Sequence, residues 1–191
     1  MLTTNQITIY SAGKTWAAPM LKIMRDTFGY NIVARWIDAE QVLATPDSVH
    51  PESVHSDENF KRFIWNSCRE DCLIADMGIL LCNPVDGEKH SGSLVETGHI
   101  TAFGKPVYIL GTCASVEPVG HSDRAWKSQE NIYRWPEYVG DASIIAEGFE
   151  RATNHYIKNY SDQWKYRRVS GSLRENYDAM FVNNPLYNRN V

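Results

Sequence analysis

The sequence has few cysteines, no long apolar run and no excess of positive charge. Its 191 residues include only four cysteines, too few for the disulfide framework of a small secreted domain. Apolar stretches such as residues 79–82 (ILLC) are far shorter than the ~20 residues that cross a bilayer. Residues 1–6 (MLTTNQ) lack the pattern of a secretory signal. We therefore expect a cytoplasmic protein that does not bind a membrane.

The net charge is −4, and it is unevenly distributed. Residues 1–150 carry 12 Lys and Arg against 20 Asp and Glu, whereas residues 151–191 carry seven against three. An acidic chain is a poor candidate for binding duplex DNA, which normally requires a basic domain. The basic segment is rich in aromatic residues, so it could bind single-stranded nucleic acid or an acidic protein neighbour.

The four cysteines do not have the spacing of a metal site. Cys68 and Cys72 lie four residues apart on a predicted helix and could in principle hold a metal ion. However, neither a CxxC nor an HxxxH motif accompanies them. We therefore interpret them as buried, reduced thiols and predict neither a metal nor another cofactor.

Apolar periodicity predicts alternating strands and helices. Strands are predicted at residues 6–11, 31–36, 77–82, 105–110 and 132–135, and helices at 16–28, 57–75, 93–103 and 142–160. This alternation is typical of an α/β fold with a single doubly wound parallel sheet, flavodoxin- or Rossmann-like, of about five strands. We divide the chain into an α/β domain at 1–150 and a helical, basic C-terminal extension at 151–191.

Parallel sheets of this kind bind ligands beyond the carboxyl ends of their strands. Three loops are therefore candidates: residues 10–15, the residues from 38 onward, and residues 83–96. The first contains Gly13 and Lys14, but the phosphate-binding motif GxxxxGK[ST] would need a glycine where the sequence has Thr8. Lys14 is interpreted either as a phosphate contact near a helix N-terminus or as a solvated surface lysine.

The third loop leads into residues 91–98 (SGSLVETG), where a small-residue segment enters a predicted helix with Glu96 in its first turn. Two interpretations have equal weight. Ser93 and Glu96 fit a capping box, with Ser93 as the N-cap and Glu96 at the third helical position. Alternatively, Glu96 is a catalytic carboxylate.

Four segments in order resemble one enzyme family. They are residues 10–13 (YSAG), 34–38 (ARWID), 70–76 (EDCLIAD), and 92–98 (GSLVETG) with 102–107 (AFGKPV). Together they resemble the nucleoside 2-deoxyribosyltransferases and their N-glycosidase relatives, over roughly residues 6–150. The resemblance implies a nucleoside or nucleoside 5′-monophosphate as substrate, and a free nucleobase as second substrate if the protein is a transferase.

The resemblance also implies roles for particular residues. Glu96 would attack C1′ of the sugar and form a glycosyl-enzyme, which passes to water or to another base. Tyr10 would orient Glu96 by a hydrogen bond. Many relatives carry the acid that protonates the base at the position of Cys68, so Asp71, about one helical turn further on, is the candidate general acid. Asp76 is expected to be structural.

Substrate contacts are also expected. The position six residues before Glu96, where relatives carry an aspartate or a serine, is His90. Small and hydroxyl residues follow it: Ser91, Gly92 and Ser93. With Lys14 this group suits a 5′-phosphate, although His90 could also be an exposed loop residue. Trp36 would stack on the base and Asp38 would bond to its edge, unless Trp36 is a buried strand residue.

Relatives form homo-oligomers in which C-terminal residues help to complete a neighbour's pocket. We therefore expect the basic extension to pack on the core or on a second subunit. Two alternatives to the enzyme remain open. Residues 84–96 loosely resemble the motif of lysine-decarboxylase-like phosphoribohydrolases, and the cysteine at position 68 favours a non-catalytic nucleotide-binding or nucleotide-sensing module.

Overall fold

The structure is a computed structural model that describes residues 2–39, 58–83, 91–112 and 131–169. The strands and α-helices are β1 (Ile9–Ala12), α1 (Ala18–Asp26), α3 (Glu58–Ile74), β2 (Met77–Leu81), α4 (Ser91–Ala102), β3 (Val107–Leu110), β4 (Ile132–Trp135) and α6 (Ala142–Val169). Short 3₁₀ segments are η1 (Thr4–Gln6), η2 (Thr15–Ala17) and η3 (Arg35–Ala39).

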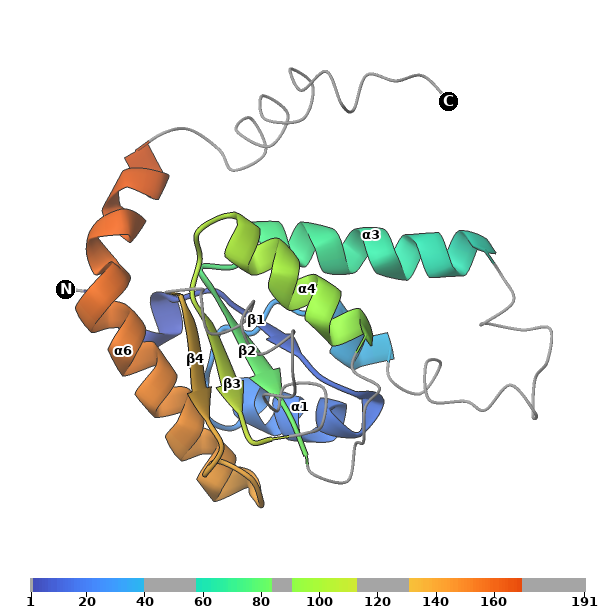
Figure 1. The fold of residues 1–191 in the computed structure, drawn as a ribbon, viewed down its shortest axis with the longest axis horizontal. Coiled ribbons are helices and arrows are strands. Elements are labelled where there is room, and N and C mark those ends of the chain that lie inside the picture. Colours follow the sequence, from blue (N-terminus) through green and yellow to red (C-terminus); the bar gives the residue numbers. More distant parts are fainter. Residues whose placement is uncertain (1, 40–57, 84–90, 113–130, 170–191) are drawn as a thin grey trace, which may run out of the picture.

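The described strands form one parallel sheet in the order β1-β2-β3-β4 (Figure 1). On the other side of β1, Ile9 forms a single parallel bridge with Ile32. The chain therefore leaves β1 toward one side and returns as β2 on the other side. The predicted doubly wound α/β fold is confirmed.

The predicted strand at residues 31–36 is wrong, because that segment contributes only the bridge and then turns into η3. Among the described residues, the sheet has four strands and a bridge instead of about five strands.

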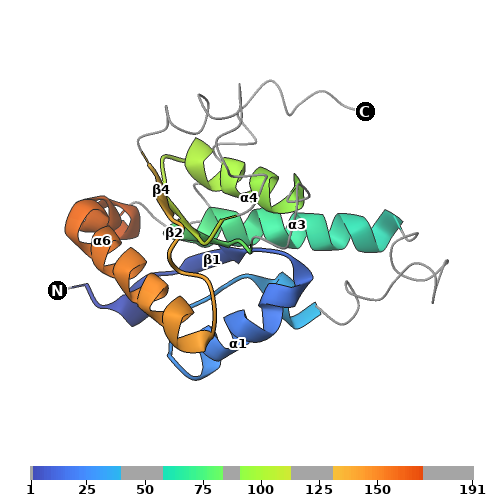
Figure 2. The ribbon, with the colours of Figure 1, turned by 60° about the horizontal axis from the view of Figure 1, so that its bottom comes forward.

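Helices cover both faces of the sheet (Figures 1 and 2). The helices α3 and α4 pack together on one face, and α1 and α6 pack together on the other. All residues of β1, β2 and β3 are buried, whereas β4 at the edge is half-buried. This double cover explains why the central strands are nearly continuous apolar runs.

Several helix boundaries follow from local chemistry. Pro19 lies in the first turn of α1, where its missing N–H costs nothing. The C-cap of α1 is Thr27, and Gly29, two residues further on, takes the left-handed conformation with a φ of 74° that reverses the chain after the helix. At the start of α6, Asp141 Oδ1 accepts hydrogen bonds from the backbone N–H groups of Ser143 and Ile144 at 3.0 and 3.2 Å.

The helix α6 continues through residue 150, where the charge of the sequence changes sign. Phe149 before this point and Ala152 and Tyr156 after it are all buried in the same core. The hydroxyls of Tyr133 on β4 and Tyr160 on α6 are 2.7 Å apart. The first turns of the basic segment therefore pack against the sheet. Residues 170–191 lie outside the described residues.

A glycine allows α4 to approach the sheet closely. A Cβ atom added to Gly78 on β2 would lie 2.8 Å from Ile100 Cδ1 and 3.1 Å from Val107 Cγ2, which is closer than packed atoms come. Gly78 is paired with Tyr10 of β1 in the sheet. The packing of α4 on β2 thus brings the helix that carries Glu96 against the strand that carries Tyr10.

Candidate active site

The candidate site lies where β1 and β2 end, at the point where the chain reverses its direction across the sheet. This is the expected ligand site of a doubly wound fold. At these ends, Ser93 Oγ on α4 donates to the carbonyl of Gly13 after β1 at 3.2 Å. At the opposite ends of the same two strands, Asp76 Oδ2, just before β2, accepts from Thr8 N–H at 2.8 Å, so the structural role predicted for Asp76 is confirmed.

Glu96 lies in the interior of α4 and not in its first turn. The helix begins at Ser91, two residues before the predicted start, so Ser93 is a helical residue and not an N-cap. The capping-box interpretation is therefore wrong. Residues 91–93 (SGS) have the composition of a loop, but they form the first turn of α4. A half-buried carboxylate that caps no helix requires another explanation.

The surroundings of Glu96 favour its protonated form. Burial raises the pKa of Glu96 from 4.5 to about 7. The neighbouring Tyr10 hydroxyl and Cys68 thiol oppose this rise, and the negative charge of Asp71 adds to it. At neutral pH, Glu96 is therefore divided between its acid and its carboxylate.

Tyr10 contributes a buried hydroxyl to the surroundings of Glu96. The residue is fully buried, and its Oη has no hydrogen bond of standard geometry among the described residues. The hydroxyl nevertheless lies near enough to Glu96 to affect its pKa, and burial raises the pKa of Tyr10 well above its usual value. The hydroxyl is thus buried beside Glu96, and the hydrogen bond by which Tyr10 would orient that carboxyl stays a prediction.

Two thiols of α3 face α4. Cys68, Cys72 and Cys82 are free and buried, as predicted, whereas Cys113 lies outside the described residues. Cys72 Sγ lies 3.8 Å from the carbonyl oxygen of Glu96. Burial raises the pKa of the Cys68 thiol to about 12, so this group is a neutral thiol and not a thiolate.

Asp71 is buried beside this group and bonded to an arginine. Its Oδ1 accepts from Arg35 Nε and its Oδ2 from the backbone N–H of Arg35, both at 2.8 Å. Burial raises the pKa of Asp71, and Arg35 opposes that rise. Sequence reasoning gave no role to Arg35, because its partner lies 36 residues further along the chain and no local pattern connects the two.

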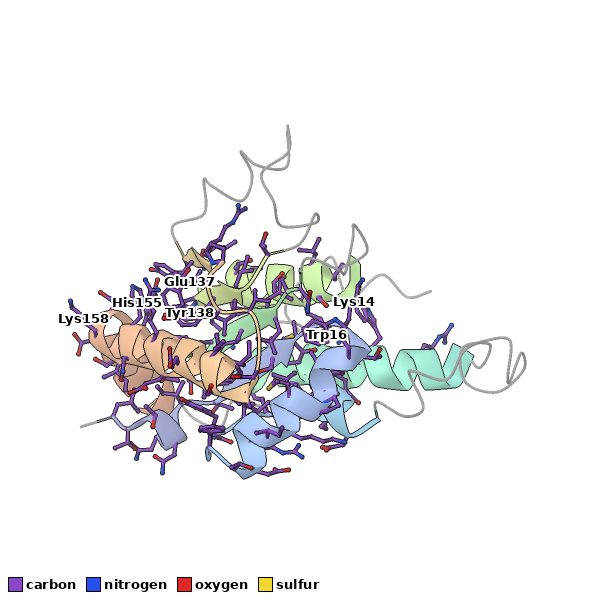
Figure 3. All side chains as sticks on the ribbon, turned by 90° about the horizontal axis from the view of Figure 1, so that it is seen from below. Lys14, Trp16, Glu137, Tyr138, His155 and Lys158 are labelled. Carbon is purple, nitrogen blue, oxygen red and sulfur yellow. The ribbon has the colours of Figure 1, made fainter. Side chains whose placement is uncertain are left out.

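The structure describes most of the residues predicted to contact the substrate, but it does not bring all of them together. Gly13 and Ser93 are brought together at the mouth of the site. Lys14 lies in the same loop, next to Trp16 (Figure 3). Gly92 is exposed in the first turn of α4. The backbone of Ser91 begins the helix, and His90 lies outside the described residues, so its predicted role remains a prediction.

Trp36 and Asp38 lie on η3 instead of a strand. Trp36 is buried, and its Nε1 donates to the carbonyl of Ser11 on β1 at 2.8 Å. The two oxygens of Asp38 accept from Arg25 at 2.9 Å each, and this pairing lowers the pKa of Asp38. Trp36 thus anchors η3 to the end of β1, while Asp38 is exposed.

The described part of the chain contains no cluster of three or more His, Cys, Asp or Glu residues suited to a metal ion. In the same residues, no helix has the length and apolar character needed to span a membrane.

No protein-family model and no curated protein matches this chain. Among solved structures, it is similar to the 2-deoxyribosyltransferase from the psychrotolerant bacterium Bacillus psychrosaccharolyticus. The similarity covers 73% of this chain and 90% of that one, with a TM-score of 0.45 and 14% identity. The chemistry of the site must therefore be argued from its own residues.

Proposed function

We propose that this protein cleaves the N-glycosidic bond of a nucleoside or nucleoside 5′-monophosphate, with Glu96 as the nucleophile. The observation that carries the proposal is the position of Glu96. It is a half-buried carboxylate in a helix interior, at the switch point of a parallel sheet, against the buried hydroxyl of Tyr10. Capping does not account for it, and a raised pKa in such a place is typical of functional carboxylates.

In the proposed reaction, the ionised carboxylate of Glu96 attacks C1′ and the C1′–N bond breaks. The base leaves with the bonding electron pair and takes up a proton. Because both oxygens of Asp71 accept hydrogen bonds from Arg35, we assign this proton to water at the mouth of the site. Water or a second base then attacks C1′ and releases Glu96, giving a free sugar or a new nucleoside, or the corresponding sugar 5-phosphate or new nucleotide when the substrate is a 5′-monophosphate.

A 5′-monophosphate is the favoured substrate. The loop that carries Lys14 is joined to the first turn of α4 by the hydrogen bond from Ser93 to Gly13. The first turn of a helix presents backbone N–H groups, which attract anions. A phosphate between the Lys14 loop and this turn would place the sugar near Glu96.

We further propose that the protein works as a homo-oligomer, with part of the basic extension at a subunit contact.

The test is to incubate the protein with a panel of nucleosides and 5′-monophosphates and to measure free base by chromatography. We expect release from monophosphates, and loss of release in Glu96→Ala and Glu96→Gln. Glu147→Gln, which changes an exposed glutamate on α6, is the matched control and should remain active. A labelled second base that appears in a new nucleoside would identify a transferase. Substrate binding without any base release would contradict the proposal.

The second candidate function is a nucleotide-binding module without catalysis. The pairing of Asp71 with Arg35 favours it, because both oxygens of this carboxyl already accept hydrogen bonds and neither is left to donate a proton to a leaving base. The module predicts that monophosphates bind to the Glu96→Gln variant and to the unmodified protein with equal affinity, and that neither protein releases base. The phosphoribohydrolase alternative depends on residues 84–90, which lie outside the described residues.

A further inference from the structure

Arg35, at the start of η3, holds the last turns of α3. Its Nε and its backbone N–H bond to the two oxygens of Asp71, both at 2.8 Å. Its Nη2 donates to Glu70 Oε2 at 2.8 Å and to the carbonyl of Ser67 at 3.1 Å. One side chain thus contacts three residues of a helix from which it is separated by more than thirty residues in the sequence.

The two partners of this ion pair differ sharply in exposure. The side chain of Asp71 is 3% exposed, whereas that of Arg35 is 52% exposed. A carboxylate in such a buried position would take up a proton if it had no compensating charge. The pair therefore places a negative charge inside the protein and leaves the compensating positive charge at the surface.

Asp71 directly precedes Cys72, whose buried thiol lies against the backbone of Glu96, so the last turns of α3 bring the buried carboxylate toward Glu96. Groups on two elements affect the pKa of Glu96: Tyr10 on β1, and Cys68 and Asp71 on α3. Cys72 of α3 also contacts the Glu96 carbonyl.

Two further charged residues lie near Asp71 and Cys72. The negative charge of Glu70 raises the pKa of Asp71, and the buried Lys105 Nζ donates to the carbonyl of Cys72 at 3.2 Å. Arg35 bonds to Asp71, Glu70 and Ser67, and of these three residues it is Asp71 that affects the pKa of Glu96.

We propose that Arg35 is a positioning residue, which keeps Asp71 as a fixed negative charge beside Glu96 and so sets the pH at which Glu96 becomes a nucleophile. This inference rests on the proposed function. Asp71 then acts on the reaction through its charge and not by proton transfer. An exposed arginine outside the substrate contacts would thus control the ionisation of a carboxylate that it does not touch.

The test is to titrate the side-chain carboxyls directly by NMR in full-length protein labelled with ¹³C in glutamate and aspartate. Glu96→Gln identifies the Glu96 signal. The proteins compared are the unmodified chain, Asp71→Asn, Arg35→Met and the double variant. We expect Asp71→Asn to lower the pKa of Glu96, because a negative neighbour is lost.

The direction of the change in Arg35→Met decides between two mechanisms. If Arg35 acts through Asp71, the unpaired Asp71 takes up a proton, its own pKa rises, and the pKa of Glu96 falls toward its value in Asp71→Asn. If Arg35 acts on Glu96 directly, loss of the positive charge raises the pKa of Glu96. If Arg35 acts only through Asp71, the double variant should match Asp71→Asn.

Two controls keep the result specific. Arg151→Met removes another half-exposed arginine that forms an ion pair, with Glu137 on the edge of the sheet, and should leave the pKa of Glu96 unchanged. Arg35→Lys keeps the positive charge but loses the planar guanidinium, so we expect a smaller fall in the pKa of Glu96 than in Arg35→Met. This variant replaces Arg35→Met in the test if Arg35→Met does not fold. A rise or no change of the Glu96 pKa in Arg35→Met would overturn the inference, as would an extra shift in the double variant.

This readout needs no substrate, so it separates the inference from the proposed function. If turnover is found, the acid limb of its pH profile should move in the same direction as the Glu96 pKa. If the pKa of Glu96 responds as expected but no nucleoside or nucleotide is cleaved, the proposed function fails and the electrostatic control by Arg35 stands.

Discussion

Replacing Glu96 by glutamine should stabilise the protein, and increasingly so as the pH rises. The pKa of Glu96 is raised from 4.5 to about 7, so the folded protein holds this proton more tightly than the unfolded chain does. Stability is therefore lost as the pH rises from about 4.5 to about 7, and the cost is fully present above that window. Glutamine is neutral at every pH, so the variant does not lose this stability.

The expected size follows from the shift. At ~1.4 kcal/mol per pKa unit, the ionised Glu96 costs about 3 kcal/mol in the free energy of unfolding above neutral pH. The free energy of unfolding of Glu96→Gln should exceed that of the unmodified protein by less than ~1 kcal/mol near pH 5, and this difference should grow by roughly 2–3 kcal/mol by pH 8. In thermal unfolding this corresponds to about 2–4 °C per kcal/mol for a chain of this size.

The assay is urea unfolding of the two proteins at several pH values, with the free energy extrapolated to water. Comparison at each pH removes the contribution of all other titrating groups. Glu147→Gln, at an exposed position on α6, should show no pH-dependent difference. The reasoning would be refuted if the advantage of Glu96→Gln stayed constant between pH 5 and 8, or declined over that range.

Three further predictions follow from the described contacts. The rate of base release should rise about tenfold between pH 6 and pH 8, as Glu96 with its pKa of about 7 becomes ionised; a flat initial-rate profile would contradict Glu96 as the nucleophile. Gly78→Ala should destabilise the protein by about 1–3 kcal/mol in urea unfolding, because its Cβ would meet Ile100 Cδ1 at 2.8 Å, and an unchanged midpoint would argue against this close packing. Trp36→Phe should cost about 1–3 kcal/mol, because the carbonyl of Ser11 loses the Nε1 donor at 2.8 Å; this is measured by the same method, and a neutral result would show that water replaces the donor.

The sheet could be predicted from the sequence because its central strands are buried on both faces. Residues 77–82 form a continuous apolar run, and the structure has β2 at Met77–Leu81. The half-buried edge strand was predicted at 132–135, and the structure has β4 at those residues. These signals are local, since burial on one or both faces of a strand leaves its pattern in the strand's own residues.

The segment at 31–36 could not be predicted correctly from local pattern. Its apolar residues suit a strand, but Arg35 is bound by Asp71 on α3 and Trp36 by Ser11 on β1. These distant partners turn the chain into η3. Glu96 was identified from a motif, whereas Arg35 could be assigned only once the fold brought η3 and α3 together.

The course of α6 limits how this protein can be shortened. The change in charge at residue 150 suggests a natural place to cut the chain, yet a fragment ending there would lose the buried side chains of Ala152 and Tyr156. It would also lose the hydroxyl of Tyr160 that meets Tyr133 on the edge strand. A fragment that retains these contacts must extend at least to residue 160. The electrostatic boundary and the folding boundary of the chain are therefore different positions.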